Sequence, residues 1–489
     1  MKKLAFTSQL VFCICLMIAC EKPEVNGPYF ATGIKIGEVS QNQAIVWVRL
    51  TENQERVGYD APQPEVLYKT DSGLIERRGR PDLTPVVNYP DGSSIKTIEG
   101  ATPGSEGMVR LKYKAVDQQE WSVMEWSAVD PQKSFTHQFE LNRLEAGTKY
   151  EFLVEASPMD QNQISASIEG TFQTAPAATE RSEVNFIVTT GTSYPDKDTE
   201  NGYQFYLNAL KRQPEFFVHT GDIVYYDGQG KTLDLAEWHW DRMYSLPNNI
   251  EFHRQVASYF IKDDHDTWMN DCYPGMETRF MGDFTYEQGT QLFLDEVPMG
   301  DKTYRTIRWG KDLQIWLVEG RDYRSPNPSP DGPGKTIWGE EQMNWFKNTV
   351  SQSDATYKIL ISPTPVVGPD RPRKNDNHAN EGFQHEGEML RKFISDQKNM
   401  VTVCGDRHWQ YVSEDLSTGL VEFSCGPGSD AHAGGWSQED NFPEHIYLNV
   451  AGGFLEGALE YENDVPGLVF RHFSEEGELL NEHFVENEM

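Results

Sequence analysis

Hydrophobic and polar residues alternate with a period of two over much of the first third of the chain. The stretch "GIKIGEVSQNQAIVWVRL" (33–50) contains two short alternating runs on either side of a polar turn. This pattern is typical of two antiparallel strands with one buried face. We expect Ile45, Trp47 and Val48 to pack inward. The pattern predicts β structure over residues 28–175.

A second feature of this region is the segment "LNRLEAGTKYEFLVEA" (141–156). A leucine, a tight glycine turn and then Tyr150 at the start of an alternating strand resemble the tyrosine corner of fibronectin-type sandwiches. Residues 71–118 are rich in glycine, proline and charge, and we expect them to form an inserted loop. The sequence therefore predicts a fibronectin-like β-sandwich domain over residues 28–178, with a structural or positioning function.

After a short polar linker, the pattern changes to buried apolar runs separated by helical periodicity. The apolar runs each stop at a polar or charged cluster, and they are "VNFIVTTG" (184–191), "PEFFVHTGD" (214–222), "LQIWLVEGRDYR" (313–324), "YKILISPTP" (357–365) and "MVTVCGDRHW" (400–409). Helical patterns at 201–213, 339–350 and 385–396 lie between several of them. Strands that alternate with helices predict an α/β layered domain over residues 183–489.

Acidic and imidazole side chains gather at four of these strand ends or in the loops that follow. They are Asp222 and Tyr225; Asp264, His265 and Asn270 in "IKDDHDTWMND"; Glu319 and Arg321; and Asp406 and His408. Each cluster alone is also typical of a capped turn or a hydrogen-bonded structural histidine. Carboxylates brought to one sheet edge, however, repel each other unless a cation neutralises them. Their recurrence at strand ends predicts a dinuclear metal centre, because ligands bind beyond the carboxyl ends of strands in open α/β sheets.

The composition adds one exclusion. The formal net charge is −33, and an acidic surface repels a phosphate backbone, so we expect no nucleic-acid partner. The hydrophobic and aromatic fractions are ordinary for a folded protein, and 489 residues are long enough for two or three domains.

The first residues indicate export. A basic "MKK" and the apolar run "LVFCICLMIA" (10–19) have the form of a signal peptide, and the run is too short to span a bilayer comfortably. Ala19 directly before Cys20 resembles a bacterial lipoprotein cleavage box; an ordinary secretory signal is the alternative. We expect residues 1–19 to be removed, lipid on Cys20 to hold the protein to a membrane, and residues 20–27 to be a tether. The protein would then be an exported bacterial lipoprotein in the periplasm or at the cell surface.

Cysteine usage argues against two further kinds of site. Only Cys272, Cys404 and Cys425 remain after the predicted lipidation site. Three thiols allow at most one disulfide and show no zinc-finger spacing, so neither a disulfide scaffold nor a structural zinc site is expected.

Four motifs of the second region occur in a recognisable order: "FFVHTGDIVYY", "KDDHDTWMND", "GRDYR" and "CGDRHW". In this order they resemble the calcineurin-like metallophosphoesterases and, among these, the alkaline phosphatase D family. The resemblance covers most of residues 183–475 and extends to the N-terminal sandwich, which that family commonly carries. It implies a layered β-sandwich flanked by helices and a metal-dependent hydrolase of phosphate esters.

The resemblance also implies a function for each matching residue. The implied metal ligands are Asp222, Tyr225, Asp264, Asn270, Asp406 and His408. Asp222 would be shared by two metal ions, and Tyr225 would bind a ferric ion. His265 would protonate the leaving group, and Arg321 would contact the oxyanion of the substrate, which suits a planar guanidinium.

The donor atoms bear on the choice of metal. Asp264 and Asp406 stand where the wider superfamily has Asn and His, which makes the second site oxygen-rich and favours calcium, or magnesium or manganese. The tyrosinate and imidazole of the first site suit iron. Calcium together with iron is the pair that the resemblance implies.

Two positions depart from the family pattern. The first strand of the family usually ends in a Ser-Cys pair whose cysteine binds iron, but this chain has "TTGTSYPD", with Gly191 at the cysteine position. Thr190, Ser193 and Asp196 are candidate replacements, and none is a soft thiolate. The iron site would then be altered, hold another metal or be lost. Glu319 also replaces the usual aspartate of its motif, and its longer side chain would shift a ligand position.

The leading hypothesis is hydrolysis of phosphate mono- or diesters, in which two cations polarise the ester and activate a bridging water. The polar loop 368–388 is the candidate for recognition of an anionic ester, with Arg324, His378 and His385 as candidate substrate-binding residues; a solvated surface loop is the alternative. A second hypothesis is a sulfatase of the same fold that acts on a sulfated polysaccharide. A third is a non-catalytic binding protein that lost a ligand at Gly191.

Overall fold

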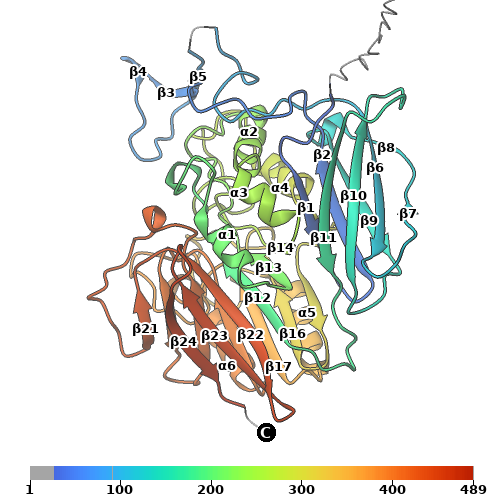
Figure 1. The fold of residues 1–489 in the computed structure, drawn as a ribbon. Helices are drawn as coiled ribbons and strands as arrows, with labels where there is room; N and C mark the ends of the chain where they lie inside the picture. The colour runs from blue at the N-terminus through green and yellow to red at the C-terminus, as the bar shows by residue number, and fades with distance from the viewer. Residues whose placement is uncertain (1–26, 91, 488–489) are drawn as a thin grey trace, which may run out of the picture.

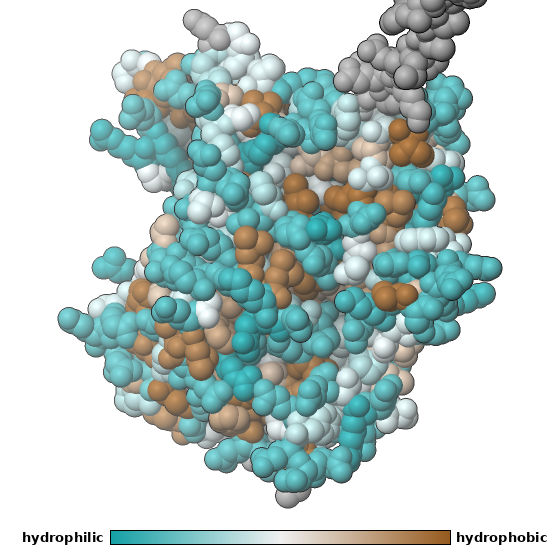
Figure 2. Space-filling view, viewed as in Figure 1, coloured by the Kyte–Doolittle hydropathy of each residue, from teal (hydrophilic) through white to brown (hydrophobic). Residues whose placement is uncertain are grey.

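The computed structural model describes residues 27–90 and 92–487 (Figure 1). The predicted signal peptide, the lipidation site at Cys20 and nearly all of the tether lie outside the described residues. Within the described part of the chain, no helix is long and apolar enough to cross a membrane. The face shown in Figure 2 is largely hydrophilic, with hydrophobic residues in separated groups.

The N-terminal region is a sandwich of two sheets. One sheet contains β1 (Ile34–Gly37), β2 (Gln43–Arg49) and β9 (Thr136–Asn142), and the other contains β11 (Ala166–Gln173), β10 (Lys149–Ser157), β6 (Met108–Ala115), β7 (Ser122–Val123) and β8 (Ser127–Ala128). Val46 and Val48 pack in the core, and Trp47 is fully buried on the opposite face of β2. Ile45 shares that opposite face and is only half-buried. The tyrosine corner is present, because the Glu145 backbone N–H donates to Tyr150 Oη at 2.9 Å.

The expected inserted loop at 71–118 contains more structure than its composition indicated. Residues 65–88 form a small sheet of β4 (Gly73–Ile75), β3 (Glu65–Thr70) and β5 (Pro85–Asn88). This small sheet lies apart from the sandwich in Figure 1, and its Tyr68 stacks on Phe280 with ring centroids 5.6 Å apart. The alternating sequence of β6 falls within the same range but is a central strand of the sandwich.

Two larger sheets form the centre of the second region. The nine-stranded sheet has the order β24 (Leu479–Val485), β23 (Val465–Phe473), β22 (Phe454–Glu462), β12 (Val184–Thr189), β13 (Phe216–His219), β14 (Ala257–Phe260), β1, β2, β9. The seven-stranded sheet has the order β15 (Arg305–Trp309), β16 (Leu313–Leu317), β17 (Tyr357–Ser362), β18 (Met400–Cys404), β20 (Val421–Cys425), β19 (Gln410–Glu414), β21 (His445–Asn449). β12–β14 run parallel to one another, as do β16–β18, so their carboxyl ends meet at one edge of each sheet.

The two sheets pack face to face and helices cover their outer faces. Phe216 contacts Trp309 and Phe423 stacks on Phe470 across the sheets, with ring centroids 4.8 and 4.1 Å apart. The nine-stranded sheet is covered by α1 (Gln204–Leu210), α2 (Leu233–Tyr244), α3 (Pro247–His253) and α4 (Tyr286–Glu296), and the seven-stranded sheet by α5 (Gly339–Gln352) and α6 (Gln384–Ser395). Short 3₁₀ turns are η1 (Pro131–Lys133), η2 (Tyr194–Asp196), η3 (Glu381–Phe383) and η4 (Asp430–His432). The predicted β-sandwich flanked by helices is confirmed.

The two regions share one sheet. β1 pairs in parallel with β14, so the sandwich strands β1, β2 and β9 extend the central sheet of the second region. The junction is buried: Lys35 Nζ donates to the Glu296 carbonyl at 2.5 Å and lies 3.5 Å from the centre of the Trp47 ring. The N-terminal region is therefore built into the sheet that carries the site described next.

Candidate metal centre

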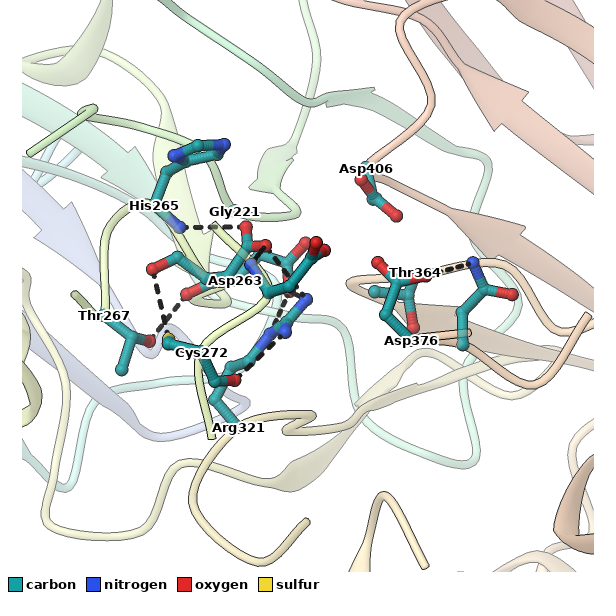
Figure 3. A network of polar contacts seen from close by, with 12 residues as sticks. Gly221, Asp263, His265, Thr267, Cys272, Arg321, Thr364, Asp376 and Asp406 are labelled. Carbon is teal, nitrogen blue, oxygen red and sulfur yellow. Dashed lines mark hydrogen bonds and ion pairs between the residues drawn. The ribbon is translucent and has the colours of Figure 1, made fainter. Parts of the chain in front are cut away.

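The carboxyl ends of β13, β14 and β18 bring most of the predicted ligands together. Ligand atoms of Asp222, Asp263 and Asp406 lie within 4.8 Å of one another, and so do those of Asp222, Asp264 and His265. Figure 3 shows Asp263, His265 and Arg321 on one side of the site and Asp406 on the other. Asp222 is common to both groups, as expected for a carboxylate shared between two metal ions.

Asp222 and Asp406 both adopt a left-handed backbone conformation, with φ of 57° and 60°. Aspartate tolerates this region better than most residues, and such strain concentrates at functional sites. The preceding Gly221 lets two loops approach closely, since a Cβ there would lie 2.6 Å from the backbone nitrogen of Asp263. Tight glycine-containing turns thus aim both carboxylates into the site.

The donor set fits metal ions. Asp222 Oδ1 and Asp263 Oδ2 are buried and have no hydrogen-bond partner among the described residues. Burial raises the pKa of Asp263 well above its usual range, with Arg321 opposing this effect and Asp264 and Asp222 adding to it. Converging carboxylates with unsatisfied oxygens are costly to bury unless cations bind between them.

Asp263 is not among the ligands that the family motifs imply. It is fully buried, its Oδ2 has no hydrogen-bond partner among the described residues, and one of its oxygens lies within 4.8 Å of ligand atoms of Asp222 and Asp406. The predicted ligand Asp264 is also buried, but its two oxygens accept backbone N–H groups from His265 at 2.9 Å and Asp271 at 2.6 Å. Both adjacent aspartates of the "DDHD" motif therefore belong to the converging groups, Asp264 with Asp222 and His265, and Asp263 with Asp222 and Asp406.

His265 lies at the edge of the site. Its Nδ1 is 2.5 Å from Asp227 Oδ2, and its side chain is 16% exposed. Burial alone would lower the pKa of His265, but the carboxylates of Asp227, Asp264 and Asp222 raise it to about 10. A protonated imidazole that remains accessible has the properties of the proton donor that the motif implies.

Tyr225 lies at the centre of a second group. Its Oη is 3.3 Å from Asp222 Oδ2, 3.5 Å from His408 Nε2 and 2.8 Å from His432 Nε2. Burial and the Asp222 carboxylate raise the pKa of Tyr225, so the phenol stays protonated unless a cation lies beside it. The sequence analysis did not identify His432. This histidine lies 24 residues after His408, next to a glycine-rich stretch, and belongs to none of the four motifs.

The candidate replacements for the missing cysteine behave differently from one another. Thr190 Oγ1 is engaged with the backbone, at 3.3 Å from the Gly221 carbonyl and 3.2 Å from the Asp406 N–H. Ser193 lines a nearby cavity. Asp196 accepts from His432 Nδ1 at 2.8 Å, and burial lowers the pKa of His432 to about 4, which keeps its ring neutral.

Arg321 and Glu319 are fully buried behind the carboxylates. Arg321 Nε donates to Asp263 Oδ1 at 2.6 Å, and its Nη1 donates to the Cys272 carbonyl at 3.3 Å. The guanidinium positions Asp263, and its contact with a substrate oxyanion stays a prediction. Glu319 Oε1 accepts the backbone N–H groups of Arg321 and Asp322 at 2.5 and 3.0 Å. Its carboxylate therefore shapes the loop and is not among the converging metal-type ligands.

Asn270 is half-buried, and its backbone connects two elements of the site. Its N–H donates to Asp227 Oδ1 at 3.4 Å and its carbonyl accepts from Arg80 at 3.4 Å. The two groups of converging ligand atoms come from carboxylates and one imidazole, and Asn270 as an amide ligand stays a prediction.

The candidate substrate-binding residues lie outside the metal centre. Arg324 is 3% exposed and donates to the Asp376 carbonyl, while His378 is 1% exposed with its Nε2 3.0 Å from Glu386 Oε2. His385 is exposed at the start of α6. Arg324 and His378 are held in internal contacts of loop 368–388 and its neighbours, because this loop packs against the protein core and is only partly solvated.

A cavity of about 280 Å³ leads to His265 and Tyr225. Its other lining residues include Arg77 and Arg80 from the small β3–β5 region, together with Asp227. Arg80 Nε lies 3.5 Å from Asp227 Oδ1, so the N-terminal region reaches the hydrogen-bond partner of His265. Cations in an otherwise acidic protein are thus gathered beside the site.

Comparison with known proteins decides the family. A profile of the PhoD-like phosphatase family matches residues 186–451. The chain belongs to this family. A structure of PhoD aligns over 96% of this chain and 94% of that chain, with a TM-score of 0.67 and 15% identity. Purple acid phosphatase PPD1 from yellow lupin (Lupinus luteus) seeds aligns over 94% and 74%, with a TM-score of 0.61 and 11% identity.

At these identities the two structures show a shared fold, and a search of curated proteins found no match. The predicted resemblance to the alkaline phosphatase D family is confirmed. This PhoD-like phosphatase is therefore a metal-dependent phosphoesterase, and the converging acidic and histidine side chains are suited to hold its metal.

Proposed function

We propose that the PhoD-like chain hydrolyses phosphate mono- or diesters that enter through the arginine-lined cavity. The observation that carries this proposal is the position of His265, which lines that cavity and also has a ring nitrogen within 4.8 Å of ligand oxygens of Asp222 and Asp264. When bound between these carboxylates, metal ions would supply an activated water and neutralise charge on the ester. His265 would give its proton to the departing alcohol, and Asp227 would hold the ring in place.

We propose that the metal ions differ between the two groups of donors. Asp222, Asp263 and Asp406 offer oxygen atoms alone, which is the preference of calcium and similar hard cations. The group around Tyr225 adds imidazole nitrogen and phenolate oxygen, which suits iron. Elemental analysis of the purified protein tests this assignment, and a single kind of ion in both places would contradict it.

The ester class is tested with purified, metal-loaded protein and a panel of aryl phosphate monoesters, aryl phosphate diesters, aryl sulfate and sulfated oligosaccharides. We expect turnover of a phosphate ester that a strong chelator abolishes and added metal restores. Turnover of sulfate esters with none of phosphate esters would contradict the proposal and favour the sulfatase alternative. No turnover and no bound metal would favour the binding protein.

Arg77 and Arg80 are expected to attract the anionic ester to the cavity. Replacing both with alanine should raise KM for phosphate esters about tenfold with a small change in kcat, because the cations act on binding and not on the reacting bond. Arg279→Ala is the matched control, since Arg279 is an exposed arginine of the same neighbourhood that pairs with Asp82 and does not line the cavity. If the wild type, the double variant and Arg279→Ala had equal KM values, Arg77 and Arg80 would have no function in substrate binding.

We further propose that Cys20 carries the lipid that holds the protein at a bacterial membrane. The support is the signal-like run that ends at Ala19 and Cys20. Metabolic labelling with a fatty acid should mark the wild-type protein and not Cys20→Ala, and the variant should leave the membrane fraction. Labelling of both proteins would contradict lipidation at Cys20.

A further inference from the structure

The position that lacks the expected cysteine is next to an imidazole ring. A Cβ built on Gly191 would lie 3.2 Å from His432 Cδ2 and 3.5 Å from its Nε2. Gly191 also has a positive φ of 50°, which glycine tolerates best. Because Gly191 has no side chain, the His432 ring can lie directly beside its backbone.

The loop that carries His432 is attached directly to the end of β12. The Gly428 N–H donates to the Gly191 carbonyl at 3.1 Å, and the Gly191 N–H donates to the Gly221 carbonyl at 3.2 Å. Ser429 Oγ donates to the Asp196 carbonyl at 2.6 Å. These contacts fix the η4 turn against the strand end from which the family's cysteine would project.

His432 presents one nitrogen to the site and has the other one engaged. Its Nδ1 lies 2.8 Å from Asp196 Oδ2, whereas its Nε2 lies 2.8 Å from Tyr225 Oη. A carboxylate on the far nitrogen is the usual partner of a metal-binding histidine, because it fixes the tautomer and the direction of the ring. Asp196 thus supplies the orientation that such a ligand needs.

The atoms gathered around Tyr225 offer more hydrogen-bond-accepting lone pairs than there are hydrogens in the group to donate to them. The phenol has one hydrogen, yet Tyr225 Oη lies within 3.5 Å of Asp222 Oδ2, His408 Nε2 and His432 Nε2. Asp222 and His408 are themselves 4.0 Å apart at the same atoms. Ligands bound to one ion at about 2.0–2.2 Å lie about 2.8–3.5 Å from one another. The distances from Tyr225 Oη already fall in that range, whereas the ligand atoms of Asp222, His408 and His432 do not all lie within 4.8 Å of one another, so these three side chains would draw together around a cation.

We propose that His432 replaces the missing thiolate as a metal ligand, and that it forms one site with Asp222, Tyr225 and His408. This inference rests on the metal-dependent hydrolysis proposed above and names a ligand that the family motifs do not contain. Two imidazoles, a phenolate and a carboxylate form a harder donor set than one with a thiolate. The site would take a ferric ion, with Asp196 as the positioning residue for His432.

Metal binding without any ester tests the inference separately from activity. Metal-free wild type is loaded with Fe³⁺, and bound iron is measured by elemental analysis and by the visible absorption of a tyrosinate–iron pair. Tyr225→Phe should lose that absorption. His432→Ala should bind one equivalent of iron less than the wild type while its calcium content stays unchanged.

Asp196→Asn keeps the size of the side chain and should weaken iron affinity about 10–100-fold with the absorption restored at saturating iron. His137→Ala is the control, because His137 is a half-buried histidine of the N-terminal sandwich far from the site in sequence and fold. Circular dichroism of each metal-free variant checks folding. Unchanged iron content and absorption in His432→Ala, or a wild type that binds no iron at this site, would overturn the inference whether or not the protein hydrolyses esters.

Discussion

His265 and Asp227 are paired in the lining of the cavity, and this pair leads to a prediction about leaving groups. His265→Ala should lower kcat by roughly 10²–10⁴ for an alkyl phosphate, because an alkoxide needs a proton as it departs. The loss should be much smaller for a nitrophenyl ester, whose leaving group is stable without a proton. Steady-state kinetics with both esters measures the contrast. An equal loss for the two esters would contradict proton donation by His265.

Arg321 allows a test of what holds the carboxylates together. Arg321→Met removes the cation paired with fully buried Asp263 and should cost about 1–3 kcal/mol of unfolding free energy in metal-free protein, because the buried carboxyl group loses its partner. Bound metal should recover part of that loss. Urea unfolding with and without metal measures both values. A variant as stable as the wild type without metal would show that Asp263 does not need this partner.

At the scale of elements, the contact between the two central sheets is held in part by Phe423 of β20 and Phe470 of β23. Phe423→Ala should lower the unfolding free energy by about 3–5 kcal/mol, through lost burial and a cavity in a packed core. Phe484 of β24 is 62% exposed, and Phe484→Ala should change stability by less than about 0.5 kcal/mol. Chemical denaturation of both variants compares them, and similar losses would contradict the packing described for β20.

Sequence reasoning located the elements whose pattern is local. The runs that became β12, β13, β16, β17 and β18 were recognisable because each is a short apolar stretch that stops at a polar cluster. The helices α2, α3 and α4 were not predicted, because their buried faces include polar and aromatic residues such as His239, Trp240 and Asn249. His432 was missed for a similar reason, since it reaches the site only because the loop after β20 folds back onto β12.

At the scale of the whole molecule, buried histidines link stability to pH. His472 is fully buried with Nε2 3.0 Å from the Ser424 carbonyl, and burial, with a smaller effect from His483, lowers its pKa to about 4. The unfolded chain has a histidine pKa near 6.5 and binds the proton first. The stability that neutral His472 contributes to the folded state is therefore fully present above about pH 6.5. This contribution is lost as the pH falls from 6.5 toward 4, because the unfolded chain then binds a proton that the folded chain does not.

This linkage predicts a loss of about 2 kcal/mol from His472 between pH 7.5 and pH 5.0. Between the same two pH values, the unfolding free energy of His472→Gln should fall by about 2 kcal/mol less than that of the wild type. Glutamine can donate a hydrogen bond to the Ser424 carbonyl and does not titrate. Urea unfolding of both proteins at the two pH values gives the difference. An identical pH dependence would show that His472 remains neutral in both states or charges in both.

The shared nine-stranded sheet has a consequence for the order in which the chain folds. Its parallel centre, β12–β14, comes from the middle of the sequence, and β22 completes it by pairing residues 455–459 with 184–188. During synthesis the ribosome makes β12 well before its partner, so one edge of this strand stays open until the last strands appear. Pairings between such distant segments form slowly. The nascent chain therefore cannot complete this sheet until nearly all of it has been made.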